Sequence, residues 1–524
     1  ESVGALLFDE FHERHLAGDL GLALALDVQS GLREDLRILV MSATLDGERL
    51  AGFLEAPRLS SAGRSYPVEV AHFPARREEA IEHQARRAIE HALATHPGDL
   101  LVFLPGQREI ARVEAALSPL PSVGEGGRKP GEGEGIEILA LHGELPIEQQ
   151  TRVLQPAADG RRRVVLATNV AESSVTLPGV RVVIDSGLAR EPRFDPNSGF
   201  ARLDVVSISQ ASADQRAGRA GRVAEGFAYR LWPQSQRLEP QRRPEIAQVE
   251  LASLALELAA WGSDALRFVD PPPTGAMAAA RDLLQRLDAL EKRLHPKPLP
   301  EGEGVVRITA RGRRMLALGT HPRLAAMLLA SNESSRIALA CDLAALVEAR
   351  DPLRSRSDAL AERWKALAAF RNGRVGADAN RSALAAIDAA SKQWRRRLRC
   401  AAPPPANAPA HALGDLLAHA FPDRIAKQHP QDPKRYLLAN GRMAKLFDDS
   451  AVHGEPWLVA SELRFEARDA LLLRAAPVDE VYLRQAFAAH FHEGDEVRWD
   501  AGRRALASER IARFDGIVLS SKPA

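Results

Sequence analysis

The chain has 524 residues, 45% hydrophobic and 27% charged, a composition typical of soluble globular proteins that excludes a disordered chain. Its 70 Lys and Arg balance 69 Asp and Glu to a net charge of +1, so any binding to nucleic acid or membrane must come from local patches. The length predicts about three to five domains. The chain contains no uninterrupted apolar run of ~18 residues, so no transmembrane helix is expected. Its two cysteines fit a reducing, cytoplasmic location. Because the chain opens on Glu1 and shows no signal peptide, we expect a piece of a longer protein.

Short apolar runs alternate with helical spans in the first half of the chain. Strands are expected at 3–8, 37–41, 100–104, 136–140, 163–167, 180–184 and 226–231, and helices at 14–31, 76–96, 107–117 and 146–154. This alternation predicts an α/β fold with a parallel sheet flanked by helices.

The pattern changes after Pro244, where residues 240–400 are expected to be mostly helical. Leucines at helical spacing run from Leu283 to Leu294, and the prolines at 271–273 form a rigid break. Beyond a proline linker at 403–405 the signal is strand-like, because Asn440-Gly441 lies between two short apolar runs and predicts a hairpin. Further strands are expected at 457–465, 469–475, 496–500 and 511–519. A small β-barrel is the expected result.

Two stretches rich in Gly and Pro, 118–135 and 295–304, interrupt helix-to-strand connections. A phosphate-binding loop at 124–135 is one interpretation. A flexible surface insert is favoured, because no Lys-Ser/Thr pair follows the glycines.

Asp9-Glu10-Phe11-His12 directly follows the first strand. In nucleotide hydrolases the first carboxylate at such a strand end holds Mg²⁺, and its neighbour polarises the attacking water. A chance acidic pair is the alternative. A metalloprotease motif is excluded, because His12 and His15 are three residues apart and the zinc motif needs four.

The segment from Gln215 to Arg222 carries the strongest signal. It places Arg216, Arg219 and Arg222 at three-residue spacing near one face of a helix or turn, with Gly218 and Gly221 allowing close approach of the backbone. Guanidinium groups match phosphate oxygens and stabilise charge in phosphoryl transfer. A solvated basic face is the less favoured alternative.

Two polar segments follow other strands. Ser42-Ala43-Thr44 would relay hydrogen bonds from a γ-phosphate site, or simply cap a helix. Residues 168–178, which begin with Thr168 and Asn169, suit contacts to a nucleic-acid backbone, although an ordinary helix cap and turn would explain them alone.

Together these segments resemble the ordered motifs of superfamily 2 DEAH-box helicases, and most closely the bacterial HrpB branch. The resemblance is carried by 9–12, 42–44, 101–110, 141–145, 168–178, 185–190 and 215–222, and in the tail by 420–426 and 435–441. It covers nearly the whole chain apart from the two Gly/Pro-rich stretches.

The resemblance implies two RecA-like domains with ATP between them, then a winged helix, a helical bundle and an OB-like barrel. The implied boundaries are 1–70 for the remnant of the first RecA-like domain, then 71–238, 239–320, 321–410 and 411–524.

The resemblance also implies a role for each motif residue in an ATP-dependent helicase that uses Mg²⁺ and acts on single-stranded nucleic acid, RNA rather than DNA. Asp9 would hold Mg²⁺ and Glu10 would position the hydrolytic water, with Gln215 beside it. Arg219 and Arg222 would be arginine fingers. The remaining roles are nucleotide binding for His12, Ser42 and Thr44 and nucleic-acid contact for Thr168 and Asn169.

One departure from the family pattern is large: the chain contains no Gly-x-x-x-x-Gly-Lys-Ser/Thr segment. The resemblance places that loop before Asp9, so we expect an internal fragment, cut at both ends, that does not hydrolyse ATP alone. The alternative function is a non-catalytic nucleic-acid-binding or adaptor module.

A basic run near the end of the helical region is not explained by these motifs. Lys392, Arg395, Arg396, Arg397 and Arg399 surround Trp394 and would contact phosphates, but a solvated helix face is favoured. Cys341 and Cys400 lack metal-ligand spacing and are expected to be buried or incidental thiols.

Overall fold

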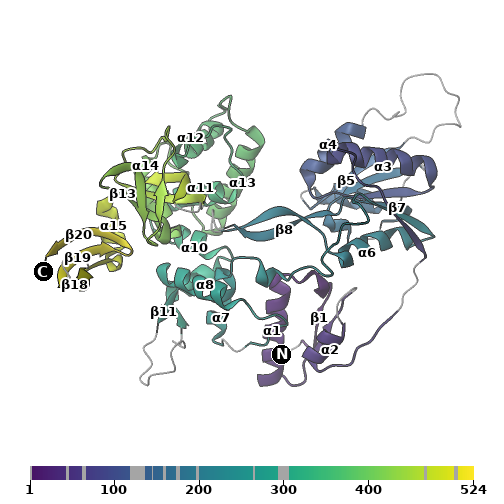
Figure 1. Cartoon of the computed structure of the whole chain (residues 1–524), viewed down its shortest axis with the longest axis horizontal. Helices are drawn as coiled ribbons and strands as arrows, with labels where there is room; N and C mark the ends of the chain where they lie inside the picture. The colour runs from purple at the N-terminus through teal and green to yellow at the C-terminus, as the bar shows by residue number, and fades with distance from the viewer. Residues whose placement is uncertain are drawn as a thin grey trace. The chain divides into compact units, whose positions relative to one another are not determined.

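The structure is a computed structural model (Figure 1), and it divides into two compact units. Unit 1 comprises 1–193, 202–249 and 266–272, and unit 2 comprises 194–201, 250–265 and 273–524. The residues described are 3–42, 47–61, 66–117, 136–143, 145–156, 161–172, 177–195, 200–263, 266–292, 306–464, 469–500 and 505–523. The two Gly/Pro-rich stretches, 118–135 and 295–304, lie outside them.

Unit 1 begins with a two-stranded parallel sheet. Its elements are β1 (Ala5–Phe8), α1 (Leu16–Gly31), β2 (Arg37–Val40) and α2 (Gly47–Leu54). One face packs Phe8 and Ile38 against the helices, whereas Leu7 is 61% and Leu39 46% exposed on the other. The strand expected at 3–8 is therefore covered on one face only, because successive side chains of a strand point to opposite sides.

A six-stranded parallel sheet forms the larger part of unit 1. Its strands, in spatial order, are β3 (Val68–His72), β10 (Gly226–Arg230), β7 (Val180–Asp185), β4 (Asp99–Phe103), β6 (Arg163–Ala167) and β5 (Glu137–Leu141). Sequence patterning predicted five of these and missed β3, whose side chains are mostly exposed and give no apolar run.

Helices cover both faces of this sheet, as the alternating residues of β4 show. Leu100 and Val102 pack against two helices, α3 (Ile81–Thr95) and α4 (Gln107–Leu117). Leu101 and Phe103 face the opposite layer, which contains α5 (Ile147–Leu154) and α6 (Gln210–Gly218). The predicted RecA-like α/β layering is confirmed.

A two-stranded sheet of β8 (Leu188–Asp195) and β9 (Phe200–Ser207) was not predicted. Its first strand carries charges and a proline, Arg190-Glu191-Pro192-Arg193, and so lacks the apolar alternation of a strand.

Unit 2 starts with a winged-helix-like group. Its elements are α7 (Ala252–Trp261), α8 (Thr274–Arg286), β11 (Leu290–Lys292), β12 (Val306–Ile308) and α9 (Ala310–Ala317). The predicted continuation of helical spacing to Leu294 is wrong. Helix α8 ends at Arg286, Asp288 adopts a left-handed backbone (φ 56°), and Leu290 then enters a strand that pairs with β12.

The helical bundle that follows is held together by a buried carboxylate. Its helices are α10 (Pro322–Leu328), α11 (Ser334–Glu348), α12 (Leu360–Arg371), α13 (Arg381–Arg397) and α14 (Ala410–Ala420). Asp342 on α11 is fully buried and receives hydrogen bonds from Arg371 (2.7 and 2.8 Å), Trp364 Nε1 (3.1 Å) and Ser391 Oγ (2.5 Å). One side chain on α11 therefore joins α12 and α13.

Five strands close into the small barrel that the sequence predicted. They are β13 (Ile425–His429), β14 (Asp432–Leu438), β15 (Met443–Lys445), β16 (Trp457–Arg464) and β17 (Ala470–Pro477), in the order β13-β14-β15-β17-β16. The predicted Asn-Gly hairpin joins β14 to β15, with Gly441 at φ 83°. Helix α14 packs so closely on this barrel that a Cβ on Gly414 would lie 1.9 Å from the Pro477 carbonyl oxygen.

The C-terminal strands form a separate sheet. It contains β18 (Phe491–Asp500), β19 (Ala505–Phe514) and β20 (Ile517–Pro523), preceded by α15 (Glu480–Ala486). The predicted single strand at 511–519 is wrong, because a turn at Asp515-Gly516 divides it between β19 and β20. The domain boundaries given in the previous subsection stay a prediction.

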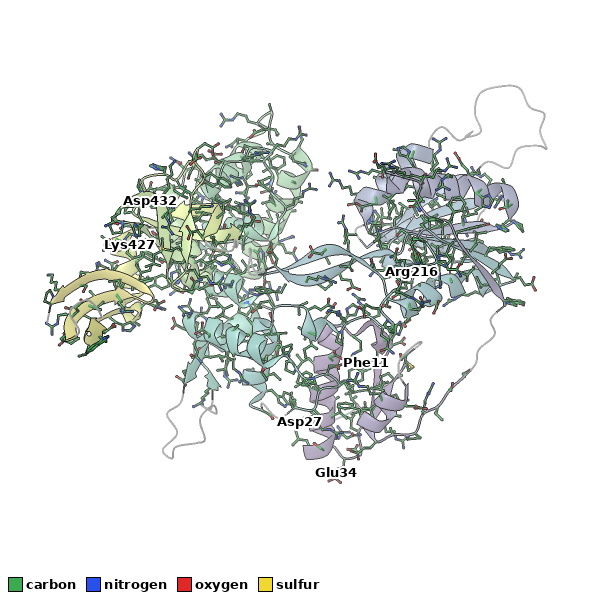
Figure 2. The ribbon with its side chains drawn as sticks, viewed as in Figure 1. Phe11, Asp27, Glu34, Arg216, Lys427 and Asp432 are labelled. Atoms are coloured by element: carbon green, nitrogen blue, oxygen red, sulfur yellow. The ribbon has the colours of Figure 1, made fainter. Side chains whose placement is uncertain are left out.

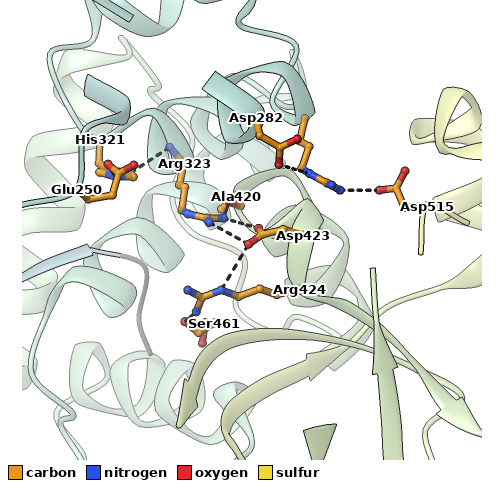
Figure 3. A network of polar contacts seen from close by, with 10 residues as sticks. Glu250, Asp282, His321, Arg323, Ala420, Asp423, Arg424, Ser461 and Asp515 are labelled. Carbon is orange, nitrogen blue, oxygen red and sulfur yellow. Dashed lines mark hydrogen bonds and ion pairs between the residues drawn. The ribbon is translucent and has the colours of Figure 1, made fainter. Parts of the chain in front are cut away.

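A second charged network ties α10 to the base of the barrel (Figure 3). Arg323 donates to Asp423 (2.6 and 3.0 Å) and to the Ala420 carbonyl (2.9 Å), and Arg424 donates to the Ser461 carbonyl at 3.3 Å. Two guanidinium groups share one carboxylate here. Burial opposes the charge of Asp423, but Arg323 and Arg424 outweigh it and lower its pKa to about 2.

No helix in the described part of the chain is long and apolar enough to span a membrane.

Removing the carboxylate of Asp342 should destabilise unit 2 strongly. Asp342→Ala leaves the Arg371 guanidinium without its main partner in the bundle, and breaking a buried ion pair costs roughly 3–5 kcal/mol. Urea unfolding followed by circular dichroism measures the loss. The control is Asp448→Ala, which removes an exposed carboxylate paired with Lys434 and should leave the midpoint unchanged. Equal midpoints for the two variants would contradict the role given to Asp342.

Candidate functional site

The two acidic residues after β1 lie in a tight turn. Glu10 adopts a left-handed backbone (φ 49°), and its N–H donates to Asp9 Oδ1 at 2.8 Å. The next residues form a short 3-10 helix (Phe11–Glu13), in which Phe11 is buried and its N–H donates to the Met41 carbonyl at 3.0 Å. This turn leaves Asp9 exposed at the carboxyl end of the strand, where a ligand can reach it.

Two further predicted nucleotide-binding residues follow different strands. His12 Nδ1 lies 3.5 Å from Glu10 Oε2, which places both side chains at one spot. Ser42 is exposed just after β2. Thr44 lies outside the described residues.

A buried arginine that the sequence did not single out anchors the same region. Arg14 is 6% exposed and bonds Asp19 (3.1 Å) on α1 and Asp270 (2.7 Å). No local sequence pattern points to Arg14, because its partner Asp270 lies far from it in the chain.

Arg216, labelled in Figure 2, is the most deeply buried arginine of the 215–222 segment. Its Nε donates to Glu172 Oε2 at 2.8 Å and its Nη1 to Asp185 Oδ1 at 2.9 Å, while its guanidinium lies 4.7 Å from the centre of the Phe103 ring. Burial opposes its charge, but the two carboxylates outweigh burial and raise the pKa of Arg216. Arg216 therefore attaches α6 to the ends of β4 and β7.

Arg219 begins the 3-10 turn (Arg219–Gly221) that follows α6, and it is only 5% exposed. Its Nε donates to the Glu172 carbonyl at 2.8 Å. Burial, followed by the neighbouring charge of Arg222, lowers the pKa of Arg219 to about 10, while Glu10 and Glu172 act in the opposite direction. Glu10 and Arg219, predicted as site residues from opposite ends of unit 1, are thus close enough to interact electrostatically.

The three arginines of this segment do not share one environment. Arg216 and Arg219 are buried, whereas Arg222 is exposed after the turn. Of the two glycines, Gly221 is required by packing, because a Cβ there would lie 2.5 Å from the Tyr66 carbonyl oxygen. No atom lies within 4 Å of the corresponding position on Gly218 in the described structure.

Thr168 and Asn169 follow β6, at the same edge of the sheet. The Thr168 N–H donates to the Leu141 carbonyl at 3.1 Å, and Asn169 is exposed at the start of a 3-10 turn (Asn169–Ala171). Residues 173–176 of this predicted segment lie outside the described residues.

A cavity of about 110 Å³ brings three of the predicted residues together. His12, Asn169 and Gln215 line it, with Glu172 and Arg216 among its other walls. The cavity is smaller than a typical ligand pocket of ~300–1,000 Å³. It is a polar gap among the motif segments and not a complete nucleotide site.

Glu172 and Asp185 are two residues of the candidate site that sequence reasoning did not single out. Both lie within segments that carried the helicase resemblance, and an acidic residue at the end of a buried strand is the signal that would have pointed to Asp185. Their partner Arg216 holds the segment in place through these two ion pairs.

The described residues contain no group of three or more His, Cys, Asp or Glu side chains placed to hold a metal ion. Asp9 alone would therefore be a partial ligand set. A Mg²⁺ ion commonly completes its shell with water and substrate phosphates.

Comparison with known proteins gives consistent matches. Residues 84–224 match the family described as Helicase conserved C-terminal domain. The ATP-dependent RNA helicase HrpB of Escherichia coli K12 is 38% identical over 529 aligned residues, covering 99% of this chain and 60% of that protein. The crystal structure of the E. coli DExH-box NTPase HrpB matches 100% of this chain and 60% of its own, with a TM-score of 0.70 at 37% identity.

Over nearly its full length the chain is similar to HrpB helicases of the DEAH/RHA type. A more distant match is the pre-mRNA-splicing factor ATP-dependent RNA helicase prp22 of Schizosaccharomyces pombe, 37% identical over 63% of this chain and 27% of that protein. The chain described here spans about 60% of the length of the E. coli relative.

His15 should make part of the stability of unit 1 depend on pH. Its ring bonds Glu13 Oε2 (2.5 Å) and Glu245 Oε1 (2.8 Å), and these bonds raise the pKa of His15 to about 9. A raised pKa means that the stabilisation is fully present below the unfolded-state value of about 6.5 and is lost as the pH rises through about 9. The melting temperature of the wild type should exceed that of His15→Gln at about pH 6, and the difference should vanish by about pH 10.

The control for this titration is His83→Gln, which changes an exposed histidine on α3 of the same unit. A difference between wild type and His15→Gln that does not change with pH would contradict the protonated bridge.

Proposed function

We propose that this chain works within an ATP-dependent RNA helicase, where it supplies the arginine segment that acts on the γ-phosphate and part of the RNA-contacting surface. The supporting observation is Arg219: a buried guanidinium, held by the Glu172 carbonyl, that interacts with Glu10 of the acidic turn. Acidic and basic groups brought together in this way fit a Mg²⁺–phosphate ligand, because the carboxylates suit the cation and the guanidinium groups suit phosphate oxygens.

Each predicted site residue takes a role in this proposal. Asp9 would hold Mg²⁺ and Glu10 would orient the hydrolytic water, with Gln215 nearby. Arg219 and Arg222 would stabilise the charge that spreads over the γ-phosphoryl group. The bound Mg²⁺ would neutralise part of the phosphate charge.

The other residues would bind the nucleotide or the strand. His12, Ser42 and Thr44 would contact the nucleotide and couple its state to movement of the protein. Thr168 and Asn169 would contact the RNA backbone, where polar side chains and amides position a strand without reading its sequence.

A second function is favoured by one observation. The 524 residues contain no Gly-Lys-Ser/Thr loop, so by themselves they would act as a nucleic-acid-binding or adaptor module. Both proposed functions place the protein in the cytoplasm.

The purified chain should not show RNA-stimulated ATP turnover, because nothing in its sequence would cradle the β-phosphate. A phosphate-release assay with and without single-stranded RNA measures this, and Glu10→Gln provides the background. Turnover that exceeds the Glu10→Gln background would show that the chain carries a complete site after all.

Arg222 tests the finger assignment in a form of the protein that carries a Gly-Lys-Ser/Thr loop. Arg222→Ala should lower ATP turnover by roughly 10³–10⁵-fold and leave RNA affinity nearly intact, because an arginine finger acts on the transition state. Arg222→Lys should restore ATP turnover poorly, since lysine keeps the positive charge but lacks the planar guanidinium fork.

The matched control is Arg237→Ala, which removes an exposed arginine of the same unit and should change neither quantity. If Arg222→Ala weakens RNA binding and spares turnover, the segment is a backbone-binding patch and the finger assignment fails.

A further inference from the structure

The last turns of α13 and the residues after them concentrate positive charge. Residues 389–400 contain five basic side chains and no acidic one, in a chain whose net charge is only +1. Three of them are Lys392, Arg395 and Arg396, which lie one helical turn or less apart and therefore share one side of the helix.

These three side chains line a hollow of about 430 Å³ together with Ala389 and Cys400. We call this hollow the basic pocket. Lys392 is already paired with Asp388 on its own helix, at 2.7 Å. Arg395 is different: its Nε is buried and has no hydrogen-bond acceptor among the described residues. Arg396 is exposed.

The helix dipole explains only part of this arrangement. Basic residues in a last turn are stabilised by the carbonyl ends of the helix, by typically about 0.3–1 kcal/mol each. That effect does not account for a hollow among them, nor for a buried N–H that lacks an acceptor.

The lining indicates which anion fits. A protein partner would need an apolar centre to its interface, and the pocket offers only Ala389 and Cys400 besides its charged residues. Nucleic-acid interfaces are polar and strongly positive, and guanidinium forks match phosphate oxygens.

We propose that the basic pocket binds the phosphate backbone of a nucleic-acid strand, as a contact carried by unit 2 in addition to Thr168 and Asn169. The choice of nucleic acid rests on the proposed function, whereas the anion site itself rests on the pocket.

Salt dependence of RNA binding tests the pocket without ATP. The probe is a fluorescein-labelled oligouridylate strand, and the variant is Arg395→Ala with Arg396→Ala, which keeps the Lys392–Asp388 pair. Each phosphate contact contributes about 0.7 to the slope of log K against log salt for a single strand, so losing two should reduce the slope by about 1.4. The affinity should fall roughly tenfold at about 0.15 M salt.

The matched control is Arg374→Ala with Arg381→Ala, which removes the same charge from exposed positions of the same bundle outside the pocket. Equal losses in the two double variants would mean general electrostatic attraction and would overturn the proposal. Arg396→Ala alone should reduce the slope by about 0.7, and it serves if the double variant fails to fold.

Cys400 offers a second readout within the pocket itself. The other cysteine, Cys341, is fully buried, and burial raises its pKa to about 12, so Cys400 is the thiol that reagents should reach. Saturating RNA should slow alkylation of Cys400 by iodoacetamide several-fold in the wild type and much less in Arg396→Ala. An unchanged rate in the wild type would overturn the proposal.

The outcomes separate this inference from the proposed function. If Thr168→Ala with Asn169→Ala weakens RNA binding while the pocket variants do not, the pocket proposal fails and the helicase proposal stands. If only the pocket variants weaken binding, the pocket is supported and the RNA contacts assigned to Thr168 and Asn169 fail. If polyglutamate protects Cys400 and RNA does not, the occupant is an acidic protein and the nucleic-acid proposal is overturned.

Discussion

The organisation of unit 1 depends on one buried guanidinium. Arg216 takes its charge out of water, and two carboxylates from separate segments, Glu172 and Asp185, compensate for that cost. Glu172 also offers its carbonyl to Arg219, so the segment after β6 and the segment after α6 are held at one place. A finger residue has to be placed to within a fraction of an ångström before it stabilises a transition state. The ion network around Arg216 provides that rigidity.

Unit 2 also contains buried ion pairs, and there they join helices to one another and to the barrel. Asp342 joins three helices of the bundle, and Asp423 shared between Arg323 and Arg424 joins α10 to the barrel. Charges buried in this way are costly unless paired, so each network admits few alternative arrangements. The overall charge of +1 hides this organisation, because it gives no information on which charges are paired and which, such as Arg395 and Arg396, line a hollow.

Several features could be predicted from the sequence because they rest on local patterns. Five strands of the six-stranded sheet are rich in apolar residues, and the Asn440-Gly441 hairpin follows from the left-handed backbone that Gly441 adopts. Strand β3 and the β8–β9 pair gave no such pattern, since their stability comes from the strands beside them and not from their own composition. The end of α8 was missed for a related reason: the leucine spacing continues into β11, where pairing with β12 overrides it.

For the candidate site, too, some features could be predicted from the sequence and others only from the tertiary structure. Sequence by itself determined the resemblance to helicases and singled out Asp9-Glu10 and the arginine segment as candidates, because the ordered motifs lie within short stretches of the chain. Only the tertiary structure decided that Arg216 is an anchor, that Arg219 is buried near Glu10 while Arg222 is exposed, and that Arg395 lines a hollow with Arg396. The physical reason is that burial and ion pairing depend on residues far apart in the chain. Arg216 and its partner Glu172 are 44 positions apart, a separation about which no local pattern carries information.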